Sequence, residues 1–224
     1  MNRLLERYVL KNYDTISFDI FDTLIERNVS DPREIFVKVG EEYFHNEKND
    51  FVKSRIAAEK NARKIKKNNE VDLDDIYIML SEYYPDKDIT MIKKIEEKTE
   101  IDAVYPKQKV VDLYNRCVAM GKKVYIISDM YLKENTIKNM LHKCGIEGYE
   151  KLYVSNVYNK TKASGQLFST LITEKHIIKK QHIHIGDSFI SDILGARKCD
   201  LRAVLVYRKN FLKRKVYTII GRYK

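Results

Sequence analysis

The sequence has little of several residue types, and each shortage argues against a class of protein. Its 224 residues contain no tryptophan, three prolines and only three cysteines, Cys117, Cys144 and Cys199. An odd number of cysteines without paired spacing argues against a disulfide framework and against a zinc site. No long apolar run is present and the first residues carry charges, so neither a signal peptide nor a membrane-spanning helix is expected. We therefore expect a globular, helix-rich, cytoplasmic protein.

Acidic residues are also missing from the end of the chain. The formal net charge is +10, and after Asp200 there is no acid but eight lysines and arginines, so most of the excess belongs to this segment. A basic tail with interleaved apolar residues, from about residue 208, could contact an anionic membrane or another polyanion, and the alternative is a solvated last helix. Since only the tail is basic and no recognised binding motif is present, no nucleic-acid partner is expected.

Hydrophobic periodicity divides the chain into two parts. Residues 29–104 show helical spacing and no convincing strand, which predicts an all-helical insertion. Residues 1–28 and 105–224 alternate strands with helices, which predicts an α/β core with a Rossmann-like open parallel sheet of about five strands. The expected strands are residues 15–19, 123–127, 151–155, 182–186 and 202–207.

Polar residues follow these strands at the points where they end. The residues concerned are Asp19, Ser128, Asp129, Lys162, Asp187 and Asp192. If the strands are parallel, their carboxyl ends meet at one edge, where open α/β sheets bind ligands. Carboxylates gathered there indicate a bound divalent cation, because like charges otherwise raise one another's pKa. No glycine-rich dinucleotide or P-loop motif occurs, which disfavours those chemistries.

Plainer interpretations of some of these residues remain open at this point. Ser128 and Asp129 would also suit the N-cap of a helix. Lys162 could be a solvated surface lysine, and Lys160 is a second candidate for the same position. His182 and His184 flank one expected strand and are interpreted as packing residues.

In order and spacing, these segments resemble the four motifs of the haloacid dehalogenase-like (HAD) superfamily. Residues 18–24, Phe-Asp-Ile-Phe-Asp-Thr-Leu, are similar to the first motif, with Asp19 at the nucleophile position. The second, third and fourth motifs are resembled by residues 126–128, 162–165 and 186–192. The helical insertion has the position of the family's cap. The resemblance implies a Mg²⁺-dependent hydrolase, most often a phosphatase of a small phosphorylated metabolite that works through an aspartyl phosphate.

The resemblance also implies a set of metal ligands. Asp19, the backbone carbonyl of Phe21 and Asp187 are expected to hold Mg²⁺, and Asp192 is expected to assist. A cation at this place would bridge the nucleophile and a phosphoryl oxygen.

Other residues are expected to contact the substrate. Lys162 would neutralise phosphoryl charge and Ser128 would donate a hydrogen bond to a phosphoryl oxygen. Thr23, in the first motif, and Asp129, directly after Ser128, are further candidates for substrate contacts.

The first motif departs from the family pattern at one position. Family phosphatases usually carry a second aspartate two residues after the nucleophile, where this chain has Phe21, and an aspartate follows one place later as Asp22. Asp22 is expected either to act as a displaced general acid or to stabilise the turn, and loss of acid–base help would slow the reaction roughly 10²–10⁴-fold. Two alternatives follow. One is a 2-haloacid dehalogenase, which tolerates an aromatic here, and the other is a non-catalytic regulatory module on the same fold.

Substrate choice is expected to lie in the helical insertion. Arg55, Glu59 and Arg63 are spaced by four residues and share one face of a helix. Arg55 is the candidate for gripping a second anionic group of the substrate. The alternative is an intrahelical salt bridge of Glu59 with either arginine, which would contribute little.

Overall fold

The computed structural model describes residues 3–45, 48–67 and 69–206. They form two compact units, an α/β unit made of the described residues up to Glu26 and from Tyr105 on, and a helical unit, Arg27–Val104. The sequence predicted boundaries after residues 28 and 104, and the two units divide after residues 26 and 104. The predicted basic tail from about residue 208 lies outside the described residues.

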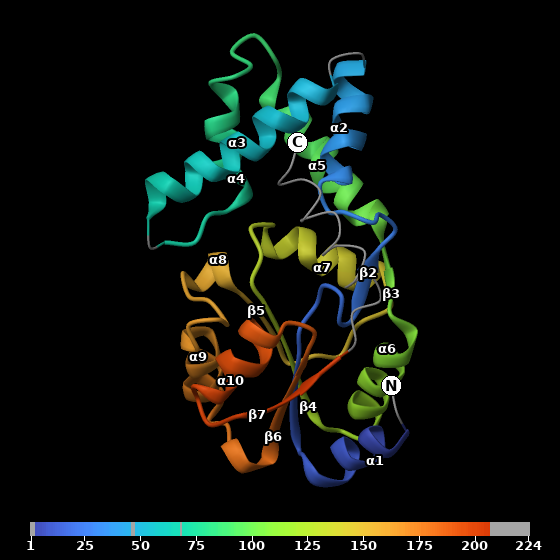
Figure 1. Cartoon of the computed structure of the whole chain (residues 1–224). Coiled ribbons are helices and arrows are strands. Elements are labelled where there is room, and N and C mark those ends of the chain that lie inside the picture. The colour runs from blue at the N-terminus through green and yellow to red at the C-terminus, as the bar shows by residue number, and fades with distance from the viewer. Residues whose placement is uncertain (1–2, 46–47, 68, 207–224) are drawn as a thin grey trace, which may run out of the picture. The chain divides into compact units, whose positions relative to one another are not determined.

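The α/β unit is built on a five-stranded parallel sheet, which confirms the predicted fold class (Figure 1). Its strands, in chain order, are β1 Thr15–Phe18, β4 Lys123–Ser128, β5 Lys151–Val154, β6 His182–Gly186 and β7 Arg202–Leu205. The strand order is β5-β4-β1-β6-β7, and every neighbouring pair is parallel. The chain winds outward from β1 in both directions, so the carboxyl end of β1 lies at the switch point where such sheets bind ligands.

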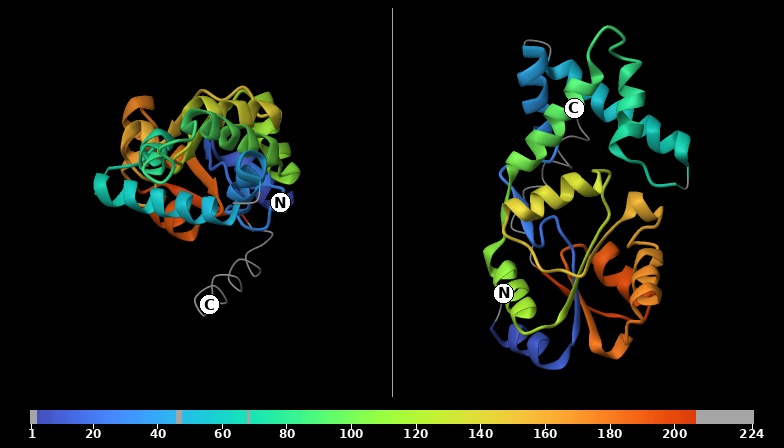
Figure 2. Two further views of the ribbon diagram at one scale, coloured as in Figure 1. Left: turned by 90° about the horizontal axis from the view of Figure 1, so that it is seen from above. Right: turned by 180° about the vertical axis from the view of Figure 1, so that it is seen from behind.

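Helices flank this sheet on both sides (Figure 2). Helices α1 and α6 lie on one side, and α9 and α10 lie on the other. The bounds of the helical segments are α1 Arg3–Asn12, α6 Gln108–Ala119, α7 Glu134–Lys143, α8 Ser155–Tyr158, α9 Gln166–Lys175, the 3₁₀ turn η2 Lys179–Gln181, the π-helical segment η3 Phe189–Leu194 and α10 Gly195–Arg197. Leu167, Phe168 and Leu171 of α9 pack with Tyr125 and Tyr153 of the sheet in one buried cluster.

The described residues of the helical unit form four helices. They are α2 Glu34–Phe44, α3 Lys48–Lys66, α4 Leu73–Ser81 and α5 Ile89–Ala103. The short strands β2, Ile25–Arg27, and β3, Val104–Pro106, pair where the chain passes between the units, and they were not predicted. In the part of the chain that the structure describes, no helix combines the length and the apolar character needed to cross a membrane.

Candidate active site

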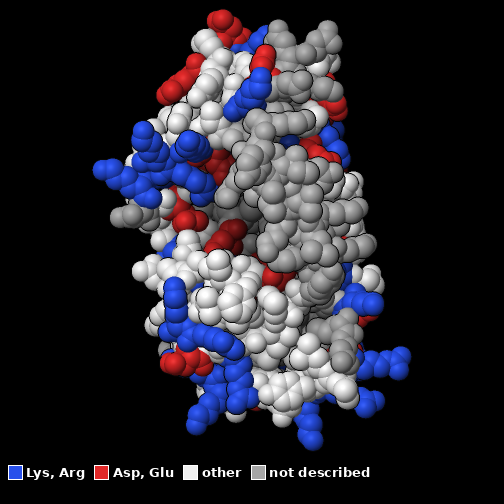
Figure 3. Space-filling view, viewed as in Figure 1, with Lys and Arg blue, Asp and Glu red and all other residues white. Residues whose placement is uncertain are grey.

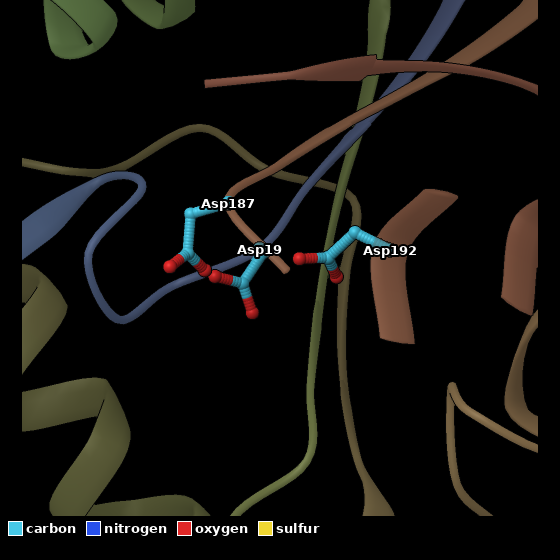
Figure 4. A group of neighbouring side chains, drawn as sticks. All are labelled: Asp19, Asp187 and Asp192. Carbon is cyan, nitrogen blue, oxygen red and sulfur yellow. The ribbon is translucent and has the colours of Figure 1, made fainter. Parts of the chain in front are cut away.

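Three carboxylates meet at the carboxyl end of the sheet (Figure 4). Asp19 follows β1, Asp187 follows β6, and Asp192 lies in η3. One ligand oxygen from each lies within 4.8 Å of the others. In Figure 4 the carboxyl group of Asp19 lies between those of Asp187 and Asp192. Asp19 and Asp192 are buried and Asp187 is half-buried. The structure therefore brings together three of the predicted metal ligands.

Lys162 places its ammonium among these carboxylates. Its Nζ lies 2.5 Å from Asp19 Oδ1 and 2.6 Å from Asp192 Oδ1, and its side chain is only 3% exposed. Burial disfavours the charged ammonium, but the facing carboxylates of Asp19 and Asp192 outweigh burial and raise the pKa of Lys162. Lys160 instead donates to Thr170 Oγ1 in an exposed hydrogen bond. Lys162, and not Lys160, is thus the lysine beside Asp19.

The charges of this cluster are not balanced. Burial raises the pKa of Asp19, the Lys162 ammonium opposes the rise, and the carboxylates of Asp192 and Asp187 add to it, giving a pKa of about 8. A single ammonium cannot neutralise three carboxylates in a buried site. Oxygen ligands that carry excess negative charge suit a hard divalent cation such as Mg²⁺. The residues present therefore fit the predicted metal.

Two glycines leave the space in which Asp192 and Lys162 are held. A Cβ added to Gly186, the last residue of β6, would lie 2.2 Å from Asp192 Cγ. A Cβ added to Gly195 would lie 2.1 Å from the carbonyl oxygen of Lys162. Close backbone approach at both places thus depends on the absence of a side chain.

Ser128 and Asp129 lie at the carboxyl end of β4. Ser128 ends β4 and is 1% exposed. Both carboxylate oxygens of Asp129 accept hydrogen bonds from the backbone N–H of Lys162, at 2.8 and 3.1 Å. Asp129 therefore positions the loop that carries Lys162, while its expected contact with substrate stays a prediction.

The first motif forms a tight turn after β1. Asp22 has a φ of 61°, its N–H donates to the carbonyl of Ile25, and its own carbonyl accepts from Lys107 Nζ at 2.6 Å. Thr23 is fully buried, and its Oγ1 has no hydrogen-bond partner among the described residues. The roles expected for the Phe21 carbonyl, the Asp22 carboxyl and the Thr23 hydroxyl stay predictions.

Arg55 does not lie where the sequence analysis expected. Its side chain is 0% exposed, and its Nε and Nη2 donate to the Glu96 carboxylate at 2.8 and 2.7 Å. Its guanidinium lies 4.4 Å from the centre of the Phe36 ring, and Nη1 is 3.3 Å from Glu59. The hydroxyl of Tyr77 also donates to Glu96. These partners occupy Arg55 inside the helical unit, which corrects the expectation that it binds substrate.

The helical unit has a basic hollow of its own. The hollow has a volume of about 390 Å³ and is lined by Arg33, Phe36, Ile56, Glu59, Lys60 and Arg63. Arg63 pairs with Glu59 at 2.9 Å and remains half exposed. Figure 3 shows Lys and Arg side chains gathered toward the C-terminal end of α3, whose last turn carries Arg63, Lys64 and Lys66.

One contact of the site was not predicted from the sequence. His184, interpreted as a packing residue, is fully buried, and its Nε2 also lies 3.1 Å from Asp192 Oδ1. The signal that could have found it is the alternation of His182 and His184 with isoleucines in one short strand.

One family model and several solved structures are similar to this chain. A family model described as a haloacid dehalogenase-like hydrolase matches residues 13–200. No match was found among curated proteins. Among solved structures, YfnB of Bacillus subtilis, a candidate HAD-hydrolase bound to magnesium, has 16% identity and a TM-score of 0.58, covering 94% of this chain and 100% of its own.

Two further solved structures are similar. A HAD family enzyme from Bacteroides thetaiotaomicron has 15% identity and a TM-score of 0.64, covering 92% of this chain and 99% of its own. The L-2-haloacid dehalogenase from Xanthobacter autotrophicus has 9% identity and a TM-score of 0.62, covering 93% of this chain and 83% of its own. At these identities the likeness shows a shared fold.

Proposed function

Because the chain belongs to the haloacid dehalogenase-like hydrolase family, we propose that it is a Mg²⁺-dependent phosphatase of a small phosphorylated metabolite. The observation that carries the proposal is the buried Lys162 ammonium, which contacts both Asp19 and Asp192 at the edge where Asp187 lies. A phosphoryl group needs both a nucleophile and positive charge around its oxygens, and this arrangement supplies both.

The proposed reaction uses Asp19 as the nucleophile. One carboxylate oxygen of Asp19 attacks phosphorus, the bond between phosphorus and the ester oxygen breaks, and the leaving oxygen takes a proton. Water then attacks the phosphorus of the aspartyl phosphate and gives a proton back to Asp22, while the bond between phosphorus and the Asp19 oxygen breaks, which releases inorganic phosphate and restores the Asp19 carboxylate. Lys162 neutralises phosphoryl charge during both steps, and Ser128 donates a hydrogen bond to a phosphoryl oxygen. Asp22 is the proposed source of the proton, since Phe21 cannot supply one.

A bound Mg²⁺ would supply positive charge beside Asp19 and Asp187, which keeps Asp19 ionised below the pKa of about 8 of the metal-free site. The magnesium bound in the YfnB structure is in line with this proposal. A cytoplasmic location, where thiols stay reduced, is in line with the free cysteines Cys117, Cys144 and Cys199.

Phosphate release from a panel of sugar phosphates and nucleotides tests the proposal. Wild type should release phosphate in Mg²⁺ and stop in EDTA, and Asp19→Asn should fall to the background rate because the amide is not a nucleophile. Asp200→Asn is the matched control, because Asp200 lies on the surface with its side chain 83% exposed. Activity that survives Asp19→Asn, or that ignores EDTA, would contradict the mechanism.

Phe21 favours a second candidate, hydrolysis of a 2-halo acid. A halide leaves without a proton, so this reaction does not need an acid at that position. Halide release from 2-chloropropionate in EDTA would identify it. Calorimetric binding of Mg²⁺ without turnover of any ester or halo acid would instead favour a regulatory binding module.

We also propose that the helical unit selects the substrate. The sheet edge offers groups that handle a phosphoryl group, whereas the basic hollow offers cations next to the apolar side chains of Phe36 and Ile56. That combination suits a substrate with a second anionic group and an apolar part.

A further inference from the structure

A line of hydrogen bonds runs between the central strands β1 and β6 and ends on Asp192. Thr15 faces His182 in the strand register, and Ser17 faces His184. His182 Nδ1 lies 3.2 Å from Thr15 Oγ1, and His182 Nε2 lies 2.9 Å from Ser17 Oγ. Ser17 Oγ lies 2.8 Å from His184 Nδ1, and His184 Nε2 lies 3.1 Å from Asp192 Oδ1. Each residue thus contacts the next, from Thr15 to the site.

The inner members of this line occupy core positions. Ser17, His182 and His184 are each 0% exposed. A buried polar side chain costs free energy unless it is hydrogen-bonded, and apolar residues of similar size would fill such positions without that requirement. Each of these side chains has hydrogen-bond partners, so its burial is compensated. The line ends on Asp192, which indicates a role at the site.

The proton positions along the line follow from its inner end. Asp192 accepts from Lys162 Nζ at Oδ1 and from the Ser188 N–H at Oδ2, so both of its oxygens act as acceptors. His184 Nε2 must therefore carry a hydrogen, and its Nδ1 accepts the Ser17 hydroxyl. Ser17 Oγ in turn accepts from His182 Nε2–H. In this pattern each of the two rings carries one hydrogen, on Nε2, and is therefore neutral.

We infer that Ser17, His182 and His184 form a positioning chain that fixes the Asp192 carboxylate and, through it, the Lys162 ammonium beside Asp19. The inference rests on the proposed function. Asp192 Oδ1 accepts from both His184 and Lys162, so the orientation of this carboxylate decides where Lys162 points.

The His184 ring is itself held in place by packing. The Phe168 ring of α9 packs against it edge to face, with 4.8 Å between the ring centres. The three chain members touch neither substrate nor phosphorus and act only through Asp192. Removing the His184 N–H leaves the Asp192 carboxylate with the Lys162 ammonium on Oδ1 and the Ser188 N–H on Oδ2, so its orientation shifts and Lys162 loses part of its direction toward Asp19.

Kinetics of three variants test the chain with p-nitrophenyl phosphate as the probe. His184→Phe keeps a planar ring without nitrogens and should lower kcat about 10²-fold, the loss expected from a misplacement of about 1 Å. His184→Gln returns an N–H donor to Asp192 and should recover part of the loss. Ser17→Ala, a smaller change that the fold tolerates more easily, should lower kcat less than His184→Phe.

The matched control is Tyr153→Phe, which removes a hydroxyl from a buried residue of the same sheet. Tyr153 donates to Glu174, away from Asp192, so kcat should stay at the wild-type value. The inference is overturned if His184→Phe and Ser17→Ala keep kcat as this control does, or if His184→Gln recovers nothing.

Nuclear magnetic resonance tests the positioning chain without requiring enzymatic activity. In ¹⁵N-labelled wild type, His182 and His184 should be neutral Nε2–H tautomers at pH 7, and an Nδ1–H tautomer or an imidazolium on His184 would overturn the chain. The Lys162 ¹⁵Nζ signal should shift in His184→Phe and return toward wild type in His184→Gln. An unchanged signal overturns the inference, whereas a shifted signal in a protein without phosphatase activity supports the chain and overturns only the proposed function.

Discussion

Replacing Gly186 by alanine perturbs the site through one defined contact. The added Cβ would lie 2.2 Å from Asp192 Cγ and 2.4 Å from its Oδ2. Carbon atoms pack at about 3.5–4.0 Å, so the Asp192 carboxylate must move by more than about 1 Å. It accepts from Lys162 Nζ at 2.6 Å and from the Ser188 N–H at 2.8 Å, and such a movement carries both distances beyond hydrogen-bonding range.

The size of the effect follows from these contacts. Overpacking in a core costs about 1–3 kcal/mol if the neighbour stays in place. Breaking a buried ion pair costs about 3–5 kcal/mol. Because movement of Asp192 relieves the clash, the second value applies, and Gly186→Ala should lower the free energy of unfolding by about 3–5 kcal/mol. A displacement of about 1 Å in the group that orients Lys162 should also lower kcat about 10²-fold.

Urea denaturation followed by circular dichroism measures the stability, and phosphate release measures kcat. Gly145→Ala is the matched control, because Gly145 has a φ of +67° and no heavy atom lies within 4 Å of an added Cβ. It should lose about 1–2 kcal/mol from backbone strain and keep its kcat. In an Asp192→Asn background, Gly186→Ala should cost much less, because both changes act on the same contact. Additive losses in stability and kcat, or a Gly186→Ala protein within about 0.5 kcal/mol of wild type, would refute the reasoning.

Three further predictions concern Arg55, Arg63 and Asp19. Arg55→Met should lower the free energy of unfolding by about 3–5 kcal/mol, because it leaves the buried Glu96 carboxylate unpaired, without changing KM. Arg63→Ala should lower the free energy of unfolding by at most about 1 kcal/mol and should raise KM if the basic hollow binds substrate. A rise in KM seen in Arg55→Met and not in Arg63→Ala would contradict the roles given to both arginines. In EDTA, Asp19→Asn should gain stability over wild type as pH rises from about 4 to about 8, because folding raises the pKa of Asp19 to about 8 and ionising it destabilises the folded state. The buried His182 and His184 make stability depend on pH in the opposite direction, but both proteins contain them, so their effect cancels in the difference. Thermal denaturation measures this difference in stability, and a value that stays constant with pH would contradict the raised pKa of Asp19.

The sheet could be predicted because strands buried on both faces are compact apolar runs. Residues 16–18 and 124–127 are buried throughout, and no amphipathic helix has that pattern. Helix α1 escaped prediction because only Val9 and Leu10 of its ten residues are buried, so its charges dominate the pattern. The order of the strands, and the three-residue strands β2 and β3, depend on long-range pairing that periodicity does not contain.

The site could be predicted as far as strand ends converge. That rule brings Asp19 and Lys162 together across 143 residues of sequence. It does not say what packs against a helix face. The ion pair of Arg55 with Glu96, which lies 41 residues away in the sequence, was therefore not predicted, and Arg55 was expected to face the substrate. The same limit applies inside the sheet, where the contact of Ser17 with His184 follows only from the register of β1 and β6.

The charge of the site bears on the choice between the two candidate reactions. A phosphate ester and a 2-halo carboxylate are both anions, and either one meets three carboxylates opposed by the single ammonium of Lys162. In a buried site such repulsion is only weakly screened, so binding requires additional positive charge. A divalent cation held by Asp19 and Asp187 would provide it, whereas in a metal-free dehalogenation the substrate carboxylate would meet carboxylates that share the one ammonium of Lys162 among the described residues. The excess negative charge therefore favours the metal-dependent phosphatase, and Phe21 affects the proton given to the leaving group rather than the binding of phosphate.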